Sequence, residues 1–150
     1  MTADEGVATR SAGDRLGLIA SSYQHLTGAP LVAAPAELWE APRAVVAHGL
    51  EPDPIFFYGN RMTLELFEMP AADFIRLPSR LSAEPLLRDE RARLLGRVAD
   101  KGFIDDYTGV RISATGRRFR IEQAVVWNLV DASGVVHGQA ATFDQWTRLD

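Results

Sequence analysis

Carboxylates give this chain its closest approach to a catalytic pattern, because Asp105 and Asp106 are adjacent and Glu122 follows in the next expected strand. Two carboxyl groups can serve as acid and base when their environments separate their pKa values. Neighbouring residues of a strand, however, point to opposite faces of a sheet, so Asp105 and Asp106 do not form a simple dyad. We therefore expect no catalytic residues. An enzyme that uses acidic residues is the most distant of three functional hypotheses.

A structural role accounts better for the polar side chains of this region. Arginines and acids are interspersed there, and we expect ion pairs that hold loops against the sheet. The predicted structural network consists of Arg80, Glu84, Asp105, Arg111 and Glu122.

Metal and nucleophile signatures are missing from the sequence. The 150 residues contain no cysteine, which excludes thiolate zinc sites, disulfides and thiol-linked flavin chemistry. The histidines His25, His48 and His137 form no i,i+4 pair and have no acidic neighbour at ligand spacing, so we expect no metal site. There is also no Gly-x-Ser-x-Gly elbow and no phosphate-binding glycine loop.

A single amide interrupts the apolar row of the segment 118–130. Strict alternation places one set of its residues on the face toward the helices. This set is Phe119, Ile121, Gln123, Val125, Trp127 and Leu129. A buried amide is costly unless it is hydrogen-bonded, so Gln123 is expected either to contact a ligand or to satisfy a backbone group.

Hydrophobic periodicity and turn residues divide the chain into helices and strands. We expect helices at 14–27, 60–70, 70–78 and 84–101, and strands at 43–48, 55–58, 104–113, 118–130 and 135–146. Short connections at both ends of the helical stretch favour one sheet. The predicted fold is α+β, with a five-stranded antiparallel sheet, helices on one face and an N-terminal helix.

Composition and charge limit the partners and the location. The formal net charge is -4 and the arginines are spread among acids, which argues against a nucleic-acid partner. No apolar run is long enough to span a bilayer, and residues 1–13 contain no apolar signal segment. We expect a cytoplasmic protein that does not bind membranes, with a disordered segment at 1–13 and a single domain at 14–150.

Several stretches of the chain resemble the MEKHLA family, which is PAS-like. They are Ala-His-Gly at 47–49, Asp-Pro-Ile-Phe-Phe-Tyr-Gly-Asn at 53–60, and the segments 77–85, 102–112 and 117–129. The resemblance implies a PAS-like fold, no enzyme activity and no settled ligand. It also implies a link to plant class III homeodomain-leucine zipper proteins, in which the domain is thought to regulate dimerisation. Haem-binding PAS domains usually ligate iron from a histidine on the helices over the sheet, and the stretch 60–102 contains no histidine, so haem is not expected.

Two further functional hypotheses therefore stay open. The first is a stand-alone sensory or regulatory module that binds a small apolar or amphipathic ligand between sheet and helices. Its candidate pocket residues are Phe57, Leu64, Phe67, Phe74, Phe103, Gln123, Trp127 and Phe143. The second is a ligand-free interaction module that forms a homodimer through the helix 14–27 and the outer sheet face around Val126 and Val130.

Overall fold

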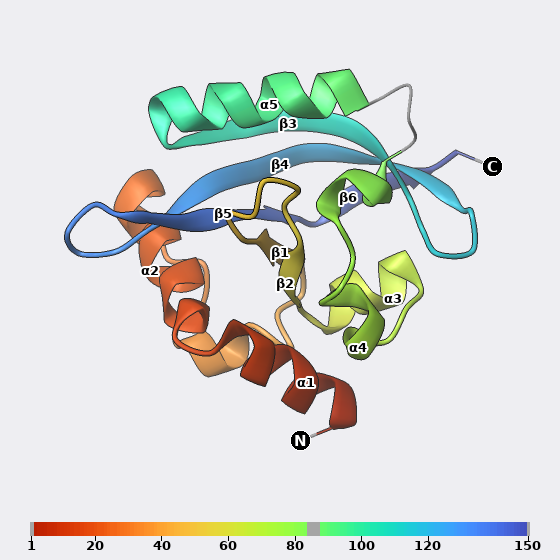
Figure 1. The fold of residues 1–150 in the computed structure, drawn as a ribbon, viewed down its shortest axis with the longest axis horizontal. Coiled ribbons are helices and arrows are strands. Elements are labelled where there is room, and N and C mark those ends of the chain that lie inside the picture. The colour runs from red at the N-terminus through yellow and green to blue at the C-terminus, as the bar shows by residue number, and fades with distance from the viewer. Residues whose placement is uncertain (1, 84–87, 150) are drawn as a thin grey trace.

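The computed structural model describes residues 2–83 and 88–149 as one sheet with helices packed on it (Figure 1). The helices are α1 (Ala3–Ala12), α2 (Arg15–Thr27), α3 (Arg61–Phe67), α4 (Ala71–Phe74) and α5 (Arg88–Lys101), with 3-10 turns η1 (Pro35–Glu37) and η2 (Ser79–Ser82). The strands are β1 (Ala44–His48), β2 (Phe56–Gly59), β3 (Phe103–Ile112), β4 (Arg118–Val130), β5 (Val136–Phe143) and β6 (Gln145–Arg148).

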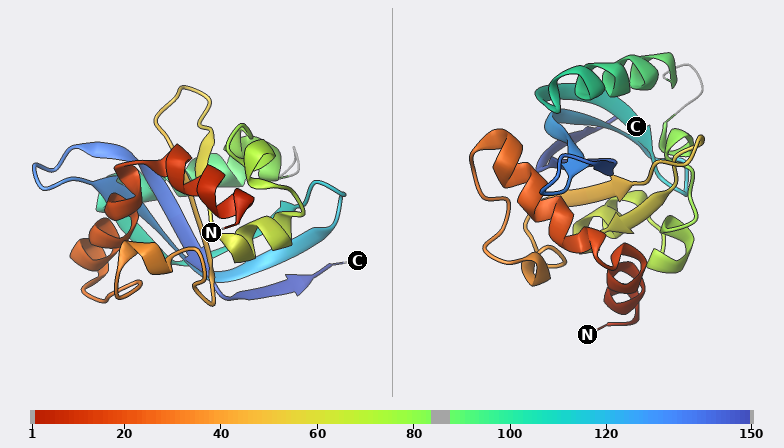
Figure 2. Two further views of the ribbon diagram at one scale, coloured as in Figure 1. Left: turned by 90° about the horizontal axis from the view of Figure 1, so that it is seen from below. Right: turned by 60° about the vertical axis from the view of Figure 1, so that its left-hand side comes forward.

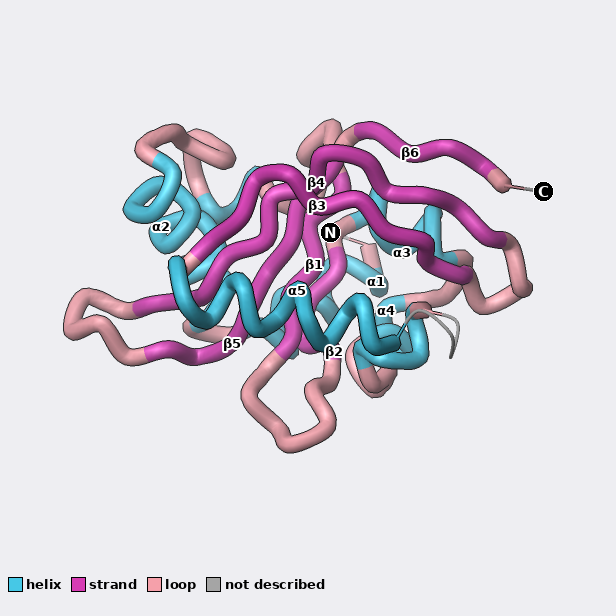
Figure 3. Tube along the Cα trace, turned by 90° about the horizontal axis from the view of Figure 1, so that it is seen from above, coloured by secondary structure: helices cyan, strands magenta, loops and turns pink. Residues whose placement is uncertain are grey.

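All strand pairs of the sheet are antiparallel, in the order β2-β1-β5-β4-β3. The predicted α+β class and the antiparallel sheet are confirmed, and the five predicted strands form a sheet of six strands in the described part of the chain. One boundary differs, because the last predicted strand divides into β5 and β6. Strand β5 pairs with the second half of β4, and β6 pairs with its first half. Figure 3 shows β6 lying beside β4.

Strand β4 changes face at Gln123. This residue has a φ of 50°, in the left-handed region, and forms a bulge that breaks the alternation of side chains. The bulge lies where the partner of β4 changes, since Glu122 pairs with β6 and Val125 with β5. The predicted inward face therefore holds for Phe119 and Ile121, and every side chain after Gln123 points the other way.

Two helical layers lie on opposite faces of the sheet (Figure 2). On one face α5 packs over β3 and β4, where Val126 joins Leu94 and Val98 in an apolar cluster. On the other face α2 packs over β4, where Tyr23 meets Trp127 edge to face with ring centroids 5.0 Å apart. Val126 and Trp127 are neighbours in a strand and point to opposite faces. Val126 and Trp127 thus belong to different apolar clusters.

Residues 3–12 form helix α1, where the sequence analysis expected disorder. The Thr2 hydroxyl caps the first turn by accepting a backbone hydrogen bond at 3.1 Å. The small side chains of Ala8 and Ala12 are buried, and α1 packs on β2 and α4. Small residues allow this close approach but give little hydrophobic periodicity, which is why the sequence pattern did not indicate a helix.

Helix α2, which the sequence analysis assigned to a dimer interface, folds onto its own sheet. Ile19 and Tyr23 are buried there. The Ser22 hydroxyl donates to the backbone oxygen of Val130 at 3.0 Å and accepts from its N–H at 2.8 Å. Val126, the other residue of the expected interface, lies under α5 on the opposite face. Within one chain, the surface proposed for dimerisation is therefore already covered.

Candidate functional site

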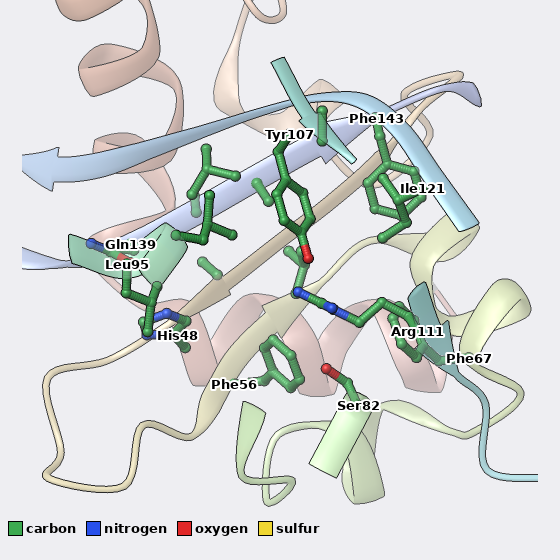
Figure 4. Close-up of a pocket in the computed structure, with 17 residues that line it drawn as sticks. His48, Phe56, Phe67, Ser82, Leu95, Tyr107, Arg111, Ile121, Gln139 and Phe143 are labelled. Atoms are coloured by element: carbon green, nitrogen blue, oxygen red, sulfur yellow. The ribbon is translucent and has the colours of Figure 1, made fainter. Parts of the chain in front are cut away.

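A cavity lies between the sheet and the helices α3 and α5, on the face opposite α2 (Figure 4). Its volume is about 70 Å³ and it is partly open to solvent. Strands β1, β3, β4 and β5 form its floor, while β2, α3, η2 and α5 form its sides. The described lining residues are Val46, Ala47, His48, Phe56, Phe67, Ser82, Leu94, Leu95, Tyr107, Arg111, Ile121, Ala124, Val126, Gln139, Ala140, Ala141 and Phe143.

Aromatic and aliphatic side chains form most of the cavity wall. Phe56 of β2 stacks on Phe74 of α4 with ring centroids 4.5 Å apart. Phe67 of α3 meets Phe119 of β4 edge to face at 5.3 Å. Such ring contacts hold the wall in a fixed geometry. The floor carries small side chains such as Ala124, which leaves space above the sheet.

One arginine side chain reaches into this apolar space. Arg111 is only 8% exposed, and Figure 4 shows its guanidinium between Tyr107 and Phe56. Nη1 donates to the backbone oxygen of Val110 at 3.0 Å. Among the residues that the structure describes, no carboxylate forms an ion pair with Arg111. Burying a guanidinium without a partner is costly, and Arg111 gives the cavity a positive charge that no described carboxylate compensates.

Gly109 provides the space that Tyr107 occupies. Tyr107, Gly109 and Arg111 alternate along β3 and share the cavity face. A Cβ atom at position 109 would overlap the Tyr107 hydroxyl. Because this side chain is absent, Tyr107 leans along the strand toward Arg111, with its ring centroid 5.3 Å from the guanidinium carbon.

A second polar group, Gln139 of β5, lies at the other end of the cavity, close to His48 (Figure 4). Its Nε2 donates to Asn128 Oδ1 at 3.0 Å. Asn128 Nδ2 in turn donates to the backbone oxygen of Val98 at 3.4 Å, which fixes the orientation of both amides. Gln139 Oε1 is buried and has no hydrogen-bond partner among the described residues. The cavity therefore has a cationic donor at one end, whereas the amide acceptor at the other end, Gln139 Oε1, is sealed among the described residues.

The structure brings two of the predicted pocket residues, Phe67 and Phe143, to the cavity wall. Phe74 lies behind Phe56 in the core. Leu64 lies beside a separate hollow near the N-terminus. The remaining aromatic candidates belong to the opposite layer, where the Arg15 guanidinium covers Phe57, and Phe103 pairs with Trp127.

Gln123 is exposed to solvent, so its predicted inward position is wrong. The bulge at this residue turns its amide away from the helices and moves the following residues to the other face. For the same reason Trp127 packs under α2 and not in the cavity. Ala124 and Val126 take the places on the cavity face that Val125 and Trp127 were expected to fill.

The predicted polar network is divided among separate places. Arg80 forms an exposed ion pair with Asp53 at 3.0 Å, and Glu122 lies 3.6 Å from Arg120. Asp105 is exposed. Arg111 points into the cavity and forms no ion pair with any acid that the structure describes, and Glu84 lies outside the described residues. Among the described members of the predicted network, no ion pair joins one to another.

The sequence analysis missed Phe56, Tyr107 and Gln139 as cavity residues and assigned Arg111 to structure. A usable signal was present in β3, where Tyr107, Gly109 and Arg111 follow a period of two. That spacing places an aromatic ring, a gap and a cation on one face. Gln139 carries no comparable signal, since nothing in its neighbours indicates which face it occupies.

Among the residues that the structure describes, no carboxylate lines the cavity. Hydrogen bonds from Ser113 and Thr115 lower the pKa of Glu68, and a hydrogen bond from His137 lowers that of Asp131, but neither acid lines the cavity. Across residues 2–83 and 88–149, no three metal-ligating side chains converge. In the same part of the chain, no helix combines the length and apolar character needed to cross a membrane.

The hollow near the N-terminus is less suited to a ligand. Its cation is already paired, since Arg61 contacts Glu40 at 2.8 Å and Glu65 at 3.2 Å. These side chains are more than half exposed, so solvent screens them. The cavity between sheet and helices is therefore the candidate functional site.

Residues 14–148 match the family model of the MEKHLA domain. Among curated proteins, the homeobox-leucine zipper protein HOX33 of Oryza sativa is 28% identical over 141 residues, which cover 86% of this chain and 16% of HOX33. REVOLUTA of Arabidopsis thaliana is 24% identical over 142 residues, which cover 86% of this chain and 17% of REVOLUTA. The chain thus spans about one sixth of the length of these relatives.

Solved PAS and light-oxygen-voltage domains share the fold. A PAS domain from Colwellia psychrerythraea has a TM-score of 0.61 at 15% identity, covering 75% of this chain and 91% of that one. A light-oxygen-voltage domain studied with a flavin analogue has a TM-score of 0.57 at 18% identity, covering 75% and 82%. The light-state dimer of the fungal photoreceptor Vivid has a TM-score of 0.55 at 12% identity, covering 73% and 78%.

Proposed function

Because the chain belongs to the MEKHLA domain family and has the PAS fold, we propose that it is a sensory or regulatory module that binds a small apolar or amphipathic ligand. The observation that carries this proposal is the cavity between the sheet and the helices, with apolar walls and a few polar groups. Ligand sites in proteins commonly have this composition. The cavity also lies between the sheet and α5, so occupancy can be transmitted to the helix that covers it.

One structural neighbour was studied with a flavin analogue. A flavin does not fit the cavity of this chain. A volume of about 70 Å³ is far below that of sites for drug-sized ligands, which measure about 300–1,000 Å³. The chain also lacks a cysteine that could form a thiol adduct. A ligand with few non-hydrogen atoms is the better match.

The ligand-free homodimer is the second candidate function. A light-state dimer is known for one structural neighbour, Vivid. In this chain, however, α2 covers its own sheet, so a dimer would need a different surface from the one predicted. An acid-base enzyme receives less support, because the described cavity lining contains no carboxylate.

Native mass spectrometry of the protein purified from its own host tests the proposal, since it reports a retained ligand and the oligomeric state together. We expect a monomer mass that exceeds 16.5 kDa by one small molecule and returns to 16.5 kDa after denaturation. Ala141→Leu adds three carbons at the cavity floor and should abolish retention. Ala92→Leu, at an exposed position of α5, is the matched control and should keep the ligand.

Two outcomes argue against the proposal. If the protein has no bound compound and is a dimer in native spectra, the interaction module is the better account. If Ala92→Leu loses the compound as readily as Ala141→Leu, the compound is bound somewhere other than the cavity.

A further inference from the structure

We propose that the cavity recognises a small organic carboxylate, with the Arg111 guanidinium holding the carboxylate and the apolar wall holding a short hydrocarbon group. This inference rests on the proposed function and adds the chemical class of the ligand. It is carried by Arg111, a residue only 8% exposed whose guanidinium points into the cavity without a described acidic partner.

The hydrogen bonding of Arg111 leaves donors available to a ligand. A guanidinium has five N–H donors, and the described residues provide one acceptor, the backbone oxygen of Val110. Its nitrogens are absent from the described buried side-chain atoms that lack a partner, which are Trp127 Nε1 and Gln139 Oε1. The remaining donors of Arg111 are therefore not sealed among the described residues, and Arg111 lines the cavity.

The charge of the cavity favours an anion. Arg111 lines it together with Tyr107, Ser82, His48 and Gln139, and no described lining residue carries a negative charge. In a weakly hydrated apolar site, a carboxylate can accept two parallel hydrogen bonds from a guanidinium, the strongest common form of this interaction. Such a ligand would provide the negatively charged partner that the described residues do not give to the Arg111 guanidinium.

The remaining walls define the rest of the ligand. Next to Arg111, the cavity is lined by Phe56, Phe67, Ile121 and Ala124, which offer no hydrogen bonds from their side chains. An apolar cavity of about 150 Å³ is known to hold benzene, so a cavity of about 70 Å³ suits a chain of a few carbons. A compact monocarboxylate such as butyrate matches both the charge and the volume.

The test compares butyrate with its neutral isostere butyramide by NMR titration of the full chain. We expect butyrate to bind with a dissociation constant at least about tenfold lower, the effect of one charge-assisted hydrogen bond. Arg111→Gln should remove this difference. Arg97→Gln, which deletes an exposed arginine of α5 paired with Asp106, is the matched control and should preserve it.

The other outcomes separate this inference from the proposed function. Equal affinities for butyrate and butyramide overturn the carboxylate but leave the binding module intact. No binding of either compound at millimolar concentration contradicts both. If inorganic phosphate binds as tightly as butyrate, the apolar wall does not contribute to recognition, and the hydrocarbon part of the inference is overturned.

If Arg111→Gln does not fold, the comparison of butyrate and butyramide in the unsubstituted protein still decides the question. Arg111→Lys then provides the second variant. It keeps the positive charge but loses the planar fork, so it should retain only part of the preference for butyrate. An undiminished preference in Arg111→Lys together with full loss of stability in Arg111→Gln would assign Arg111 to structure.

Discussion

The Tyr107 ring lies against the Arg111 side chain on the cavity face of β3, with the ring centroid 5.3 Å from the guanidinium carbon. The two residues are separated by Gly109, whose lack of a side chain lets the tyrosine lie along the strand. This arrangement holds the guanidinium within the cavity, because the aromatic ring limits the positions that the flexible arginine can occupy. The shape of the cavity therefore depends on a glycine that has no side chain.

Gly109→Ala should damage both the cavity and the fold. The new methyl group would overlap the Tyr107 hydroxyl and force the ring out of its position, and such overpacking costs about 1 to 3 kcal/mol. We expect a lower midpoint of urea unfolding and weaker binding of butyrate. Gly96→Ala in α5 is the control, since a Cβ there meets nothing and should stabilise the helix by about 0.5 to 1 kcal/mol. An unchanged midpoint for Gly109→Ala would contradict the packing described here.

Asn60 should be one of the residues least tolerant of substitution. Its Oδ1 accepts from the backbone N–H of Val45 at 3.0 Å and of Thr63 at 3.2 Å. Its Nδ2 donates to the backbone oxygens of Leu38 at 2.9 Å and Arg43 at 2.8 Å. One buried amide thus joins β1, the start of α3 and the segment before β1.

Asn60→Ala leaves several buried polar groups without partners, at a cost of about 1 to 3 kcal/mol each. We expect the free energy of unfolding to fall by more than about 3 kcal/mol in urea titrations. The exposed Gln24→Ala on α2 is the control and should change it by less than about 0.5 kcal/mol. A loss for Asn60→Ala as small as that of the control would show that these hydrogen bonds do not form in solution.

Gln123 offers a test of the bulge in β4. A side chain at a φ of 50° is strained, and glycine relieves this strain, whereas a β-branched residue increases it. Gln123→Gly should therefore be neutral or stabilising, and Gln123→Val should destabilise by about 1 to 2 kcal/mol. Chemical denaturation gives the order directly. If valine proves as stable as glycine, β4 runs without a bulge and Trp127 faces the helices of the cavity.

The same residue shows where inference from sequence stops. The periods of the hydrophobic pattern and the turn residues predicted the helices α2 to α5, the strands and the antiparallel sheet, because these features are local. The bulge at Gln123 has no local signal, since left-handed positions usually carry glycine or asparagine. One undetected bulge reversed the faces of the residues after it. As a result, Trp127 was predicted to line the cavity but does not, and Ala124 lines the cavity but was not predicted to.

Arg111 shows a second limit. Its sequence neighbours include acids, so an ion pair was a reasonable expectation. Whether a given arginine meets a carboxylate depends on which strands lie beside it and on their register, which are properties of the whole sheet. The register of β3 against β4 places Arg111 opposite Phe119, and the nearby side chains are aromatic.

The turn between β4 and β5 should become less stable in acid. Hydrogen bonds from His137, from the Ser133 hydroxyl and from the Val135 N–H lower the pKa of Asp131 below its ordinary value of 3.8. A carboxyl group whose pKa is lower in the folded state stabilises that state above the unfolded pKa. This contribution should be complete above about pH 5 and should be lost as the pH falls below 3.8 toward the folded pKa.

NMR titration of the Asp131 carboxyl carbon measures this pKa. Asp131→Asn should remove this part of the pH dependence of the unfolding free energy, while Asp144→Asn, at an exposed position between β5 and β6, should leave it unchanged. A titration midpoint of Asp131 at or above 3.8 would mean that the contacts in the turn are not maintained.

The location of bound butyrate decides whether this domain holds a small ligand between its sheet and α5, as we propose. Intermolecular nuclear Overhauser effects between butyrate and the methyl groups of the protein report that location. We predict contacts to Ile121, Ala124 and Val126 on the cavity face of β4, and none to Leu129, which lies on the face under α2. Contacts to Leu129 and α2 without contacts to the cavity face, or no intermolecular contacts at saturating butyrate, would contradict the account.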